Sequence, residues 1–160
     1  FSKVLNIMVV REAGIIFRGF NLVNAKYHQT SANKVDSDLR SSLITALLNF
    51  CEGAFSSPDV EYFELKKFSI SFTKSKIQPT DSEEPENLIV YAIFDSEKNT
   101  EKYIRKVLKP VLQSIAQTFI QENEGKNLSE ITQFRSFKST FDEIFGDLRH
   151  TLDNKFESIF

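Results

Sequence analysis

The chain opens with two apolar runs, residues 4–10 and 15–20, on either side of the polar break Glu12-Ala13-Gly14. Glycine accepts the positive φ of a tight connection, so the pattern predicts a β-hairpin that turns at this break. The first run is apolar on both alternating sets: Leu5, Ile7 and Val9 on one side, and Val4, Met8 and Val10 on the other. Such a strand must be covered on both faces, which predicts a central sheet between helices.

The next segment, Asn21 to Val35, shows no apolar period, and we expect it to be a long connection. Asp36 is a candidate N-cap, because its carboxylate can accept the free amides of a first helical turn. A helix is predicted from there to about Phe55. Its sheet-facing side is predicted to carry residues four apart, with Ile44 and Leu48 widening the same face: Leu39, Leu43, Leu47, Cys51 and Phe55.

Two strands are predicted between Val60 and Ser75, joined at Lys66-Lys67. The first, Val60 to Leu65, has the charge content of a sheet edge. The second alternates apolar with polar residues, which predicts one buried face and one polar face: Phe68, Ile70, Phe72 against Ser69, Ser71, Thr73. After the acidic, proline-containing loop Lys76–Asn87, the run Leu88–Phe94 is again apolar on both faces, so it should neighbour the first strand.

The C-terminal part predicts two helices. One begins near Asn99-Thr100, is expected to kink at Pro110 and ends at Gly125, a residue suited to the left-handed conformation after a last turn. The other begins near Ser129 and keeps a 3–4 apolar spacing: Phe134, Phe137, Phe141, Ile144 and Leu148. Leu152, Phe156 and Ile159 continue this stripe beyond Gly146.

The resulting order is β-β-α-β-β-β-α-α. The fold class predicted is α/β (α+β): a three-layer sandwich with a five-stranded antiparallel sheet of order 2-1-5-4-3, one helix on one face and two on the other. The 160 residues are expected to form a single domain, with residues 146–160 a C-terminal helix extension that folds back or protrudes. The only methionine is Met8, so we expect that the true start precedes Phe1.

Composition excludes some classes of function. The net charge of −2 argues against a nucleic-acid binder, and no apolar run reaches the length of a membrane span. The single cysteine fits a reducing compartment weakly.

No catalytic, cofactor or metal constellation can be assembled from the sequence. The only histidines are His28 and His150, and Cys51 lies on an apolar helix stripe, where a core cysteine is favoured over a reactive thiol paired with His28. The acidic cluster Asp81, Glu83, Glu84 and Glu86 favours a solvated loop over a basic-partner or calcium site, since it lacks the glycine of a calcium loop. We therefore expect no enzyme, no cofactor and no metal.

Two features are candidate partner-binding surfaces. The last apolar stripe extends beyond what the sheet can cover, so its residues should contact a partner or second copy, fold back on the domain, or touch a membrane: Phe145, Leu148, Leu152, Phe156 and Ile159. The predicted edge strand carries Tyr62 and Phe63. It either accepts a partner strand or is an ordinary edge with Phe63 buried.

The element order resembles the longin domain, and more distantly the roadblock and profilin-like sheets. The segments that carry the resemblance are VLNIMVVREAGIIFRGF, DLRSSLITALLNFCEGAF, ELKKFSISFT and NLIVYAIFD, within about Val4 to Phe145. The match is one of hydrophobic pattern and order. Only fifteen residues follow Phe145, too few for the heptad motif of a SNARE.

The resemblance implies a non-enzymatic, cytoplasmic protein-interaction domain of vesicle-mediated transport, of archaeal type. It would act as an adaptor, a scaffold or a regulator of small GTPases or of coat and tether components. Its partners would be such proteins or a second copy, without nucleic acid and with at most peripheral membrane contact. The alternative is a small-molecule-binding sensor of profilin-like fold, with the segment Asn21 to Val35 as a lid.

Overall fold

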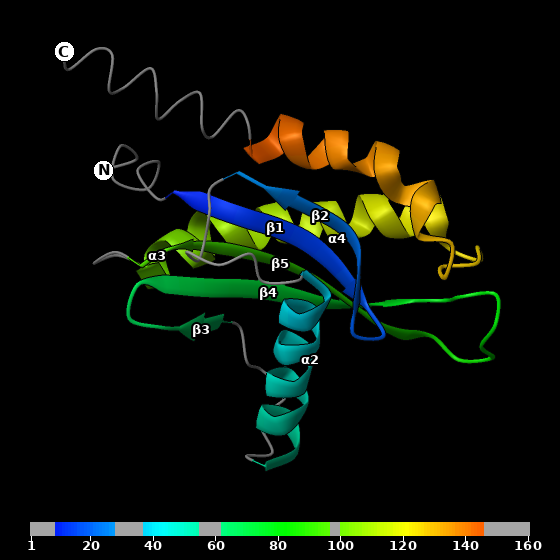
Figure 1. Cartoon of the computed structure of the whole chain (residues 1–160), viewed down its shortest axis with the longest axis horizontal. Coiled ribbons are helices and arrows are strands. Elements are labelled where there is room, and N and C mark those ends of the chain that lie inside the picture. The colour runs from blue at the N-terminus through cyan, green and yellow to red at the C-terminus, as the bar shows by residue number, and fades with distance from the viewer. Residues whose placement is uncertain (1–8, 28–36, 55–61, 97–99, 146–160) are drawn as a thin grey trace.

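The structure, a computed structural model, describes residues 9–27, 37–54, 62–96 and 100–145 (Figure 1). Its elements are, in chain order, β1 (Val10–Phe17), β2 (Phe20–Lys26), α2 (Ser37–Ala54), β3 (Tyr62–Glu64), β4 (Phe68–Ile77), β5 (Glu86–Asp95), α3 (Thr100–Tyr103), the π-helical η1 (Ile104–Leu108), α4 (Lys109–Asn123) and the 3-10 helix η2 (Ile131–Phe137). Residues 138–145 continue as α-helix.

The five strands form one antiparallel sheet in the order β2-β1-β5-β4-β3, which confirms the predicted fold and strand order. The two strands with apolar residues on both faces, β1 and β5, are neighbours, as expected. One face packs against α4 and the helical segment 131–145, and the other packs against α2. Figure 1 shows α2 crossing the strand direction steeply and projecting away from the sheet.

The first hairpin turns at Arg18-Gly19, so the predicted turn at Glu12–Gly14 is wrong. Arg18 and Gly19 have φ values of 53° and 83°, the two positive values that a two-residue hairpin turn of the I′ kind requires. Strand β2 follows at once, with Phe20 paired to Phe17. The segment predicted as a long connection therefore begins as a strand, and its residues 28–35 lie outside the described part, as do residues 4–8 of the predicted first strand.

Gly14 lies inside β1 and serves close packing. A Cβ atom at this position would be 2.7 Å from the backbone oxygen of Val23 and 2.8 Å from the hydroxyl oxygen of Tyr91. These distances are shorter than any ordinary van der Waals contact, so only glycine fits between the two neighbouring strands without a shift.

Helix α2 has nearly the predicted bounds but presents a different face to the sheet. Ser41, Ile44 and Leu48 are buried, whereas Leu43 and Leu47 are exposed. A strict four-residue spacing advances by about 40° at each step, because an α-helix has 3.6 residues per turn, so such a series cannot stay on one face. The other members of the predicted stripe, Leu39, Cys51 and Phe55, lie outside the residues whose side chains the structure describes.

Strand β4 is buried on both faces, which corrects the prediction of a polar face. Ser69 and Ser71 are 0% and 1% exposed, because α4 covers this side of the sheet. The hydroxyl of Ser69 shares a 2.7 Å hydrogen bond with that of Ser96, which satisfies a polar group away from water.

The helical segment from Thr100 to Asn123 continues through Pro110, as predicted. A π-helical turn, η1, comes just before Pro110 and is closed by a hydrogen bond from the Lys109 amide to the Ile104 carbonyl. The kink expected at Pro110 stays a prediction. Gly125 has a φ of 77°, the left-handed conformation predicted for the residue after the last turn. The following segment begins as a 3-10 helix at Ile131 and buries four aromatic rings, Phe134, Phe137, Phe141 and Phe145.

Candidate functional site

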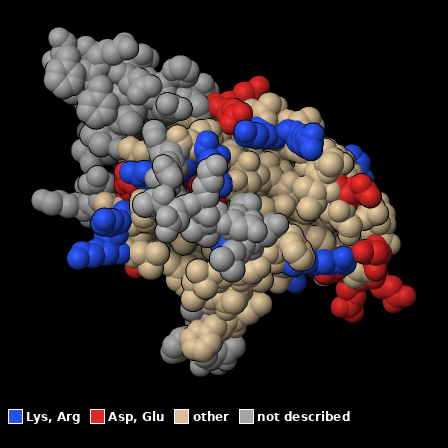
Figure 2. Space-filling model, in the orientation of Figure 1, with Lys and Arg blue, Asp and Glu red and all other residues tan. Residues whose placement is uncertain are grey.

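The outward side of α2 exposes large apolar side chains. Leu43 is 58%, Leu47 36% and Phe50 61% exposed, and their spacing places them on one side of the helix. We call these three residues the α2 outer face. No charged residue occurs between Ser41 and Phe50, and the described surface of the projecting part of α2 is uncharged on the face that Figure 2 shows. A solvated helix usually carries charges opposite its buried stripe, so this surface has the composition of a contact site.

A buried ion pair fixes α2 to the sheet. Glu12 of β1 is 1% exposed, and its Oε1 accepts a hydrogen bond of 2.5 Å from Nη2 of Arg40 in α2. Oε2 accepts a second, of 3.3 Å, from Nε of Arg40. The β1–β5 register shifts between Val10 and Glu12, a bulge at Arg11 that allows Val10 and Ala13 to face the α4 side together. Glu12 thereby points to the α2 side.

Two neutral groups complete the coordination of the Glu12 carboxylate. The hydroxyl of Tyr91 donates to Oε2 over 2.7 Å, and the side-chain amide of Asn24 donates to the same oxygen over 3.0 Å. Burial raises the pKa of Tyr91, and the negative charge of Glu12 raises it further, so the phenol stays protonated. We call Glu12, Arg40, Asn24 and Tyr91 the Glu12 cluster. Its carboxylate accepts from four donor atoms on three side chains, and through Arg40 the cluster holds α2 in place.

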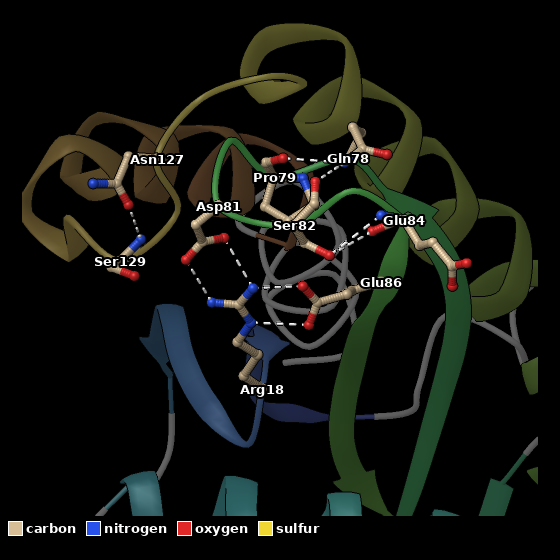
Figure 3. A network of polar contacts seen from close by, with 9 residues as sticks. All are labelled: Arg18, Gln78, Pro79, Asp81, Ser82, Glu84, Glu86, Asn127 and Ser129. Carbon is tan, nitrogen blue, oxygen red and sulfur yellow. Dashed lines mark hydrogen bonds and ion pairs between the residues drawn. The ribbon is translucent and has the colours of Figure 1, made fainter.

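The hairpin tip is tied to the β4–β5 loop by an arginine clamp (Figure 3). Arg18 donates two hydrogen bonds to Glu86, of 2.9 and 2.5 Å, and two to Asp81, both of 2.9 Å. The guanidinium lowers the pKa of both carboxyl groups, and the pair of carboxylates raises the pKa of Arg18. Two members of the predicted acidic cluster thus bind within the chain, and the other two, Glu83 and Glu84, are exposed.

The edge-strand candidates lie where the sequence placed them. Strand β3 is the terminal strand of the sheet beside β4, as predicted, although it spans only Tyr62–Glu64. Both aromatic residues are half-buried: the ring of Phe63 lies 5.4 Å from that of Phe72 on the α2 side, and Tyr62 packs against the core on the α4 side. In the described part of the chain β3 pairs on one side only, with β4, so the two alternatives for it stay open.

The candidate stripe at the C-terminal end is described only at Phe145. This ring is 3% exposed and lies 6.1 Å from the rings of both Tyr27 and Phe141, so it contributes to the core of this chain. The remaining candidates, Leu148, Leu152, Phe156 and Ile159, lie outside the described residues.

The described residues contain no group of three or more His, Cys, Asp or Glu that could hold a metal ion. His28, His150 and the side chain of Cys51 fall outside them, so the thiol–histidine alternative is not tested. Sequence analysis missed the α2 outer face and the Glu12 cluster. The signal for the first was present: eleven consecutive residues without a charge, Ser41 to Cys51, in a helix that also has a second apolar stripe at Ile44 and Leu48.

Within the described ranges, no helix has the length and apolarity needed to cross a membrane. A comparison with models of known protein families found none that matches this chain, and a comparison with curated proteins found no match either.

Proposed function

We propose that this chain is a non-enzymatic protein-interaction domain and that the α2 outer face binds its partner. The observation that carries the proposal is the exposure of Leu43, Leu47 and Phe50 on a helix segment without charge. Burying a large apolar side chain is worth roughly 1.5–3 kcal/mol. A partner that covers these side chains therefore gains apolar contact without desolvating a charged group.

The rigidity of α2 supports the same proposal. The Arg40–Glu12 pair and the buried contacts of Ile44 and Leu48 fix the helix on the sheet before any partner arrives. A preorganised surface loses less conformational freedom on binding than a mobile one. Tyr62 and Phe63 on β3 are proposed as a second contact, because Phe63 belongs to the apolar cluster beneath α2.

The resemblance to longin domains suggests the partner: a small GTPase, with the chain acting as an adaptor, scaffold or regulator in vesicle trafficking, in the cytoplasm or at a membrane periphery. The sensor alternative is less favoured, because its proposed lid begins as strand β2.

The test compares wild type with the double variant Leu43→Ser/Leu47→Ser. Binding to purified small GTPases of the source organism, loaded with GDP or a GTP analogue, is measured by biolayer interferometry. Wild type should bind at least one of them, and the double variant should bind at least about tenfold more weakly, because both substituted side chains are expected to be buried in the contact. Light scattering on the same samples reports self-association.

The control is Ile131→Ser, which replaces an exposed apolar residue (47% exposed) on η2, against the other face of the sheet. This variant should bind like wild type. A wild-type chain that is monomeric and binds none of the GTPases contradicts the proposal, and so does an equal loss in the double variant and the control.

A further inference from the structure

A cavity of about 340 Å³ opens between the hairpin tip, the flank of α2 and the ends of β4 and β5. Its apolar lining comes from Ile16, Leu48 and Ile89, one residue from each of three elements. The amides of Asn49 and Asn87 add hydrogen-bonding groups to the wall. The hydroxyl of Thr45, also in the wall, donates to the Ser41 carbonyl over 2.9 Å and can still accept a hydrogen bond. The volume lies in the range of small-molecule sites, and the combination of apolar floor and polar rim is typical of them.

Two lysines of β4 provide the charge of this cavity. Side chains alternate along a strand, so Lys74 and Lys76 lie on the same face as Ile70 and Phe72, which pack under α2. Lys74 is paired across the sheet with Ile89, and Lys76 is paired with Asn87. Partial burial lowers the pKa of Lys74, and the charge of Lys76 lowers it further. An anion between the two ammonium groups would offset both unfavourable effects.

The acidic group in the lining of the cavity already binds a basic side chain. Within the described part of the chain, Glu86 is the only carboxylate of the lining, and it binds Arg18 in the clamp that also includes Asp81. Three basic side chains, Arg18, Lys74 and Lys76, belong to the described lining, and Arg18 is bound by Glu86 and Asp81. The clamp keeps Glu86 directed at Arg18, so the two lysines are the groups of this lining suited to an anion.

We propose that this cavity binds a small phosphomonoester with an apolar body. Two ammonium groups match the double negative charge of a phosphate, which lysine binds as a point charge. The apolar body would lie on Ile16, Leu48 and Ile89. The site is independent of the proposed protein contact, because Thr45 and Asn49 are on a different flank of α2 from Leu43 and Leu47.

The test uses 1-naphthyl phosphate as the probe, with 1-naphthol and inorganic phosphate as its two halves. Titration into the ¹⁵N-labelled full chain, followed by NMR, should shift the amides of Gly19, Thr45, Asn49 and Asn87 in a saturable manner. Each half alone should bind at least tenfold more weakly. Absence of saturable binding of 1-naphthyl phosphate in the millimolar range overturns the proposal, and so do shifts that map elsewhere.

The lysines are tested with the double variant Lys74→Met/Lys76→Met. It should bind the probe at least tenfold more weakly than wild type by calorimetry. Lys66→Met/Lys67→Met is the matched control: it removes the same charge from the exposed β3–β4 connection, outside the lining, and should leave the affinity unchanged. Equal weakening in both double variants would mean general charge attraction and would overturn the site. The wild-type NMR map remains decisive if the lysine variant fails to fold.

Discussion

The two faces of the sheet are built from different chemistry. The face under α4 and segment 131–145 is packed by aliphatic and aromatic side chains, with Phe119 in contact with Phe134 and Phe137 at ring distances of 5.2 Å. The face under α2 has a smaller apolar cluster, a buried ion pair, a glycine that admits a tyrosine hydroxyl and an open cavity. The first face is built for stability.

Features that stability alone does not require are found on one of these two faces. Exposed leucines, a buried carboxylate and a lysine pair beside apolar groups all cost free energy in the isolated chain. The leucines of the α2 outer face, Glu12 and the lysine pair lie on the α2 side, whereas Ile131 on η2 is a single exposed apolar residue on the other side. Functional sites are where proteins most often depart from optimal packing, so this asymmetry places both proposed contacts on one side of the sheet.

The largest expected effect is on the free energy of unfolding, when one buried leucine is replaced on each face of the sheet. Leu112→Ala in α4 should lower the free energy of unfolding by about 4 kcal/mol, because Leu112 is fully buried and its neighbours are closely packed. Leu48→Ala in α2 should cost about 2 kcal/mol, because Leu48 borders a cavity already open to solvent. Urea unfolding measures both. Equal losses, or a larger loss at Leu48, would contradict the contrast between the faces.

The next effect tests the Glu12 cluster. Arg40→Met leaves a carboxylate that is 1% exposed without its counter-charge and should cost about 3 kcal/mol. The double variant Glu12→Gln/Arg40→Met removes the uncompensated charge while an amide oxygen still accepts from Tyr91, so it should recover at least half of that loss. Denaturant unfolding at neutral pH provides the measurement. A double variant as unstable as Arg40→Met would show that the cluster is not held by charge pairing.

Local sequence patterns predicted the sheet order, the bounds of α2 and strand β5, since each depends on a long apolar period. They did not predict the hairpin turn. Glu12 and Gly14 resemble turn residues locally, but their roles are set by Arg40 in α2 and Tyr91 in β5, which are distant in the sequence. Contacts of this kind leave no periodic signal, so a buried charge was mistaken for a solvent-exposed break.

The sequence pattern also predicted the wrong side of α2 to face the sheet, and the reason is similar. The helix has two apolar stripes, one through Ile44 and Leu48 and one through Leu43 and Leu47, and periodicity alone does not say which one meets the sheet. The ion pair of Arg40 with Glu12 and the burial of Ser41 fix the stripe through Ile44 and Leu48 against the sheet. From the sequence alone, the α2 outer face could therefore be recognised only because the helix has more apolar residues than one buried side needs. The cavity needed the structure, because Lys74 and Lys76 become neighbours of Ile16 only through strand pairing.

The smallest expected effect concerns the arginine clamp at the border of the two proposed contacts. Arg18 holds the pKa of Asp81 and Glu86 below their ordinary values of 3.8 and 4.5. A carboxyl group with a lowered pKa in the folded state stabilises the fold above its unfolded pKa, and this contribution is lost as the pH falls through the folded value. Because the clamp is exposed, Arg18→Met should lower the Tm only slightly at pH 7, and the difference from wild type should shrink as the pH falls below the ordinary pKa values of the two carboxyl groups. Arg105→Met, which removes an exposed arginine from η1, should show no such pH dependence. A difference for Arg18→Met that persists unchanged at low pH would mean that packing of the arginine on Phe17, whose ring centre is 4.8 Å away, rather than charge, holds the hairpin tip.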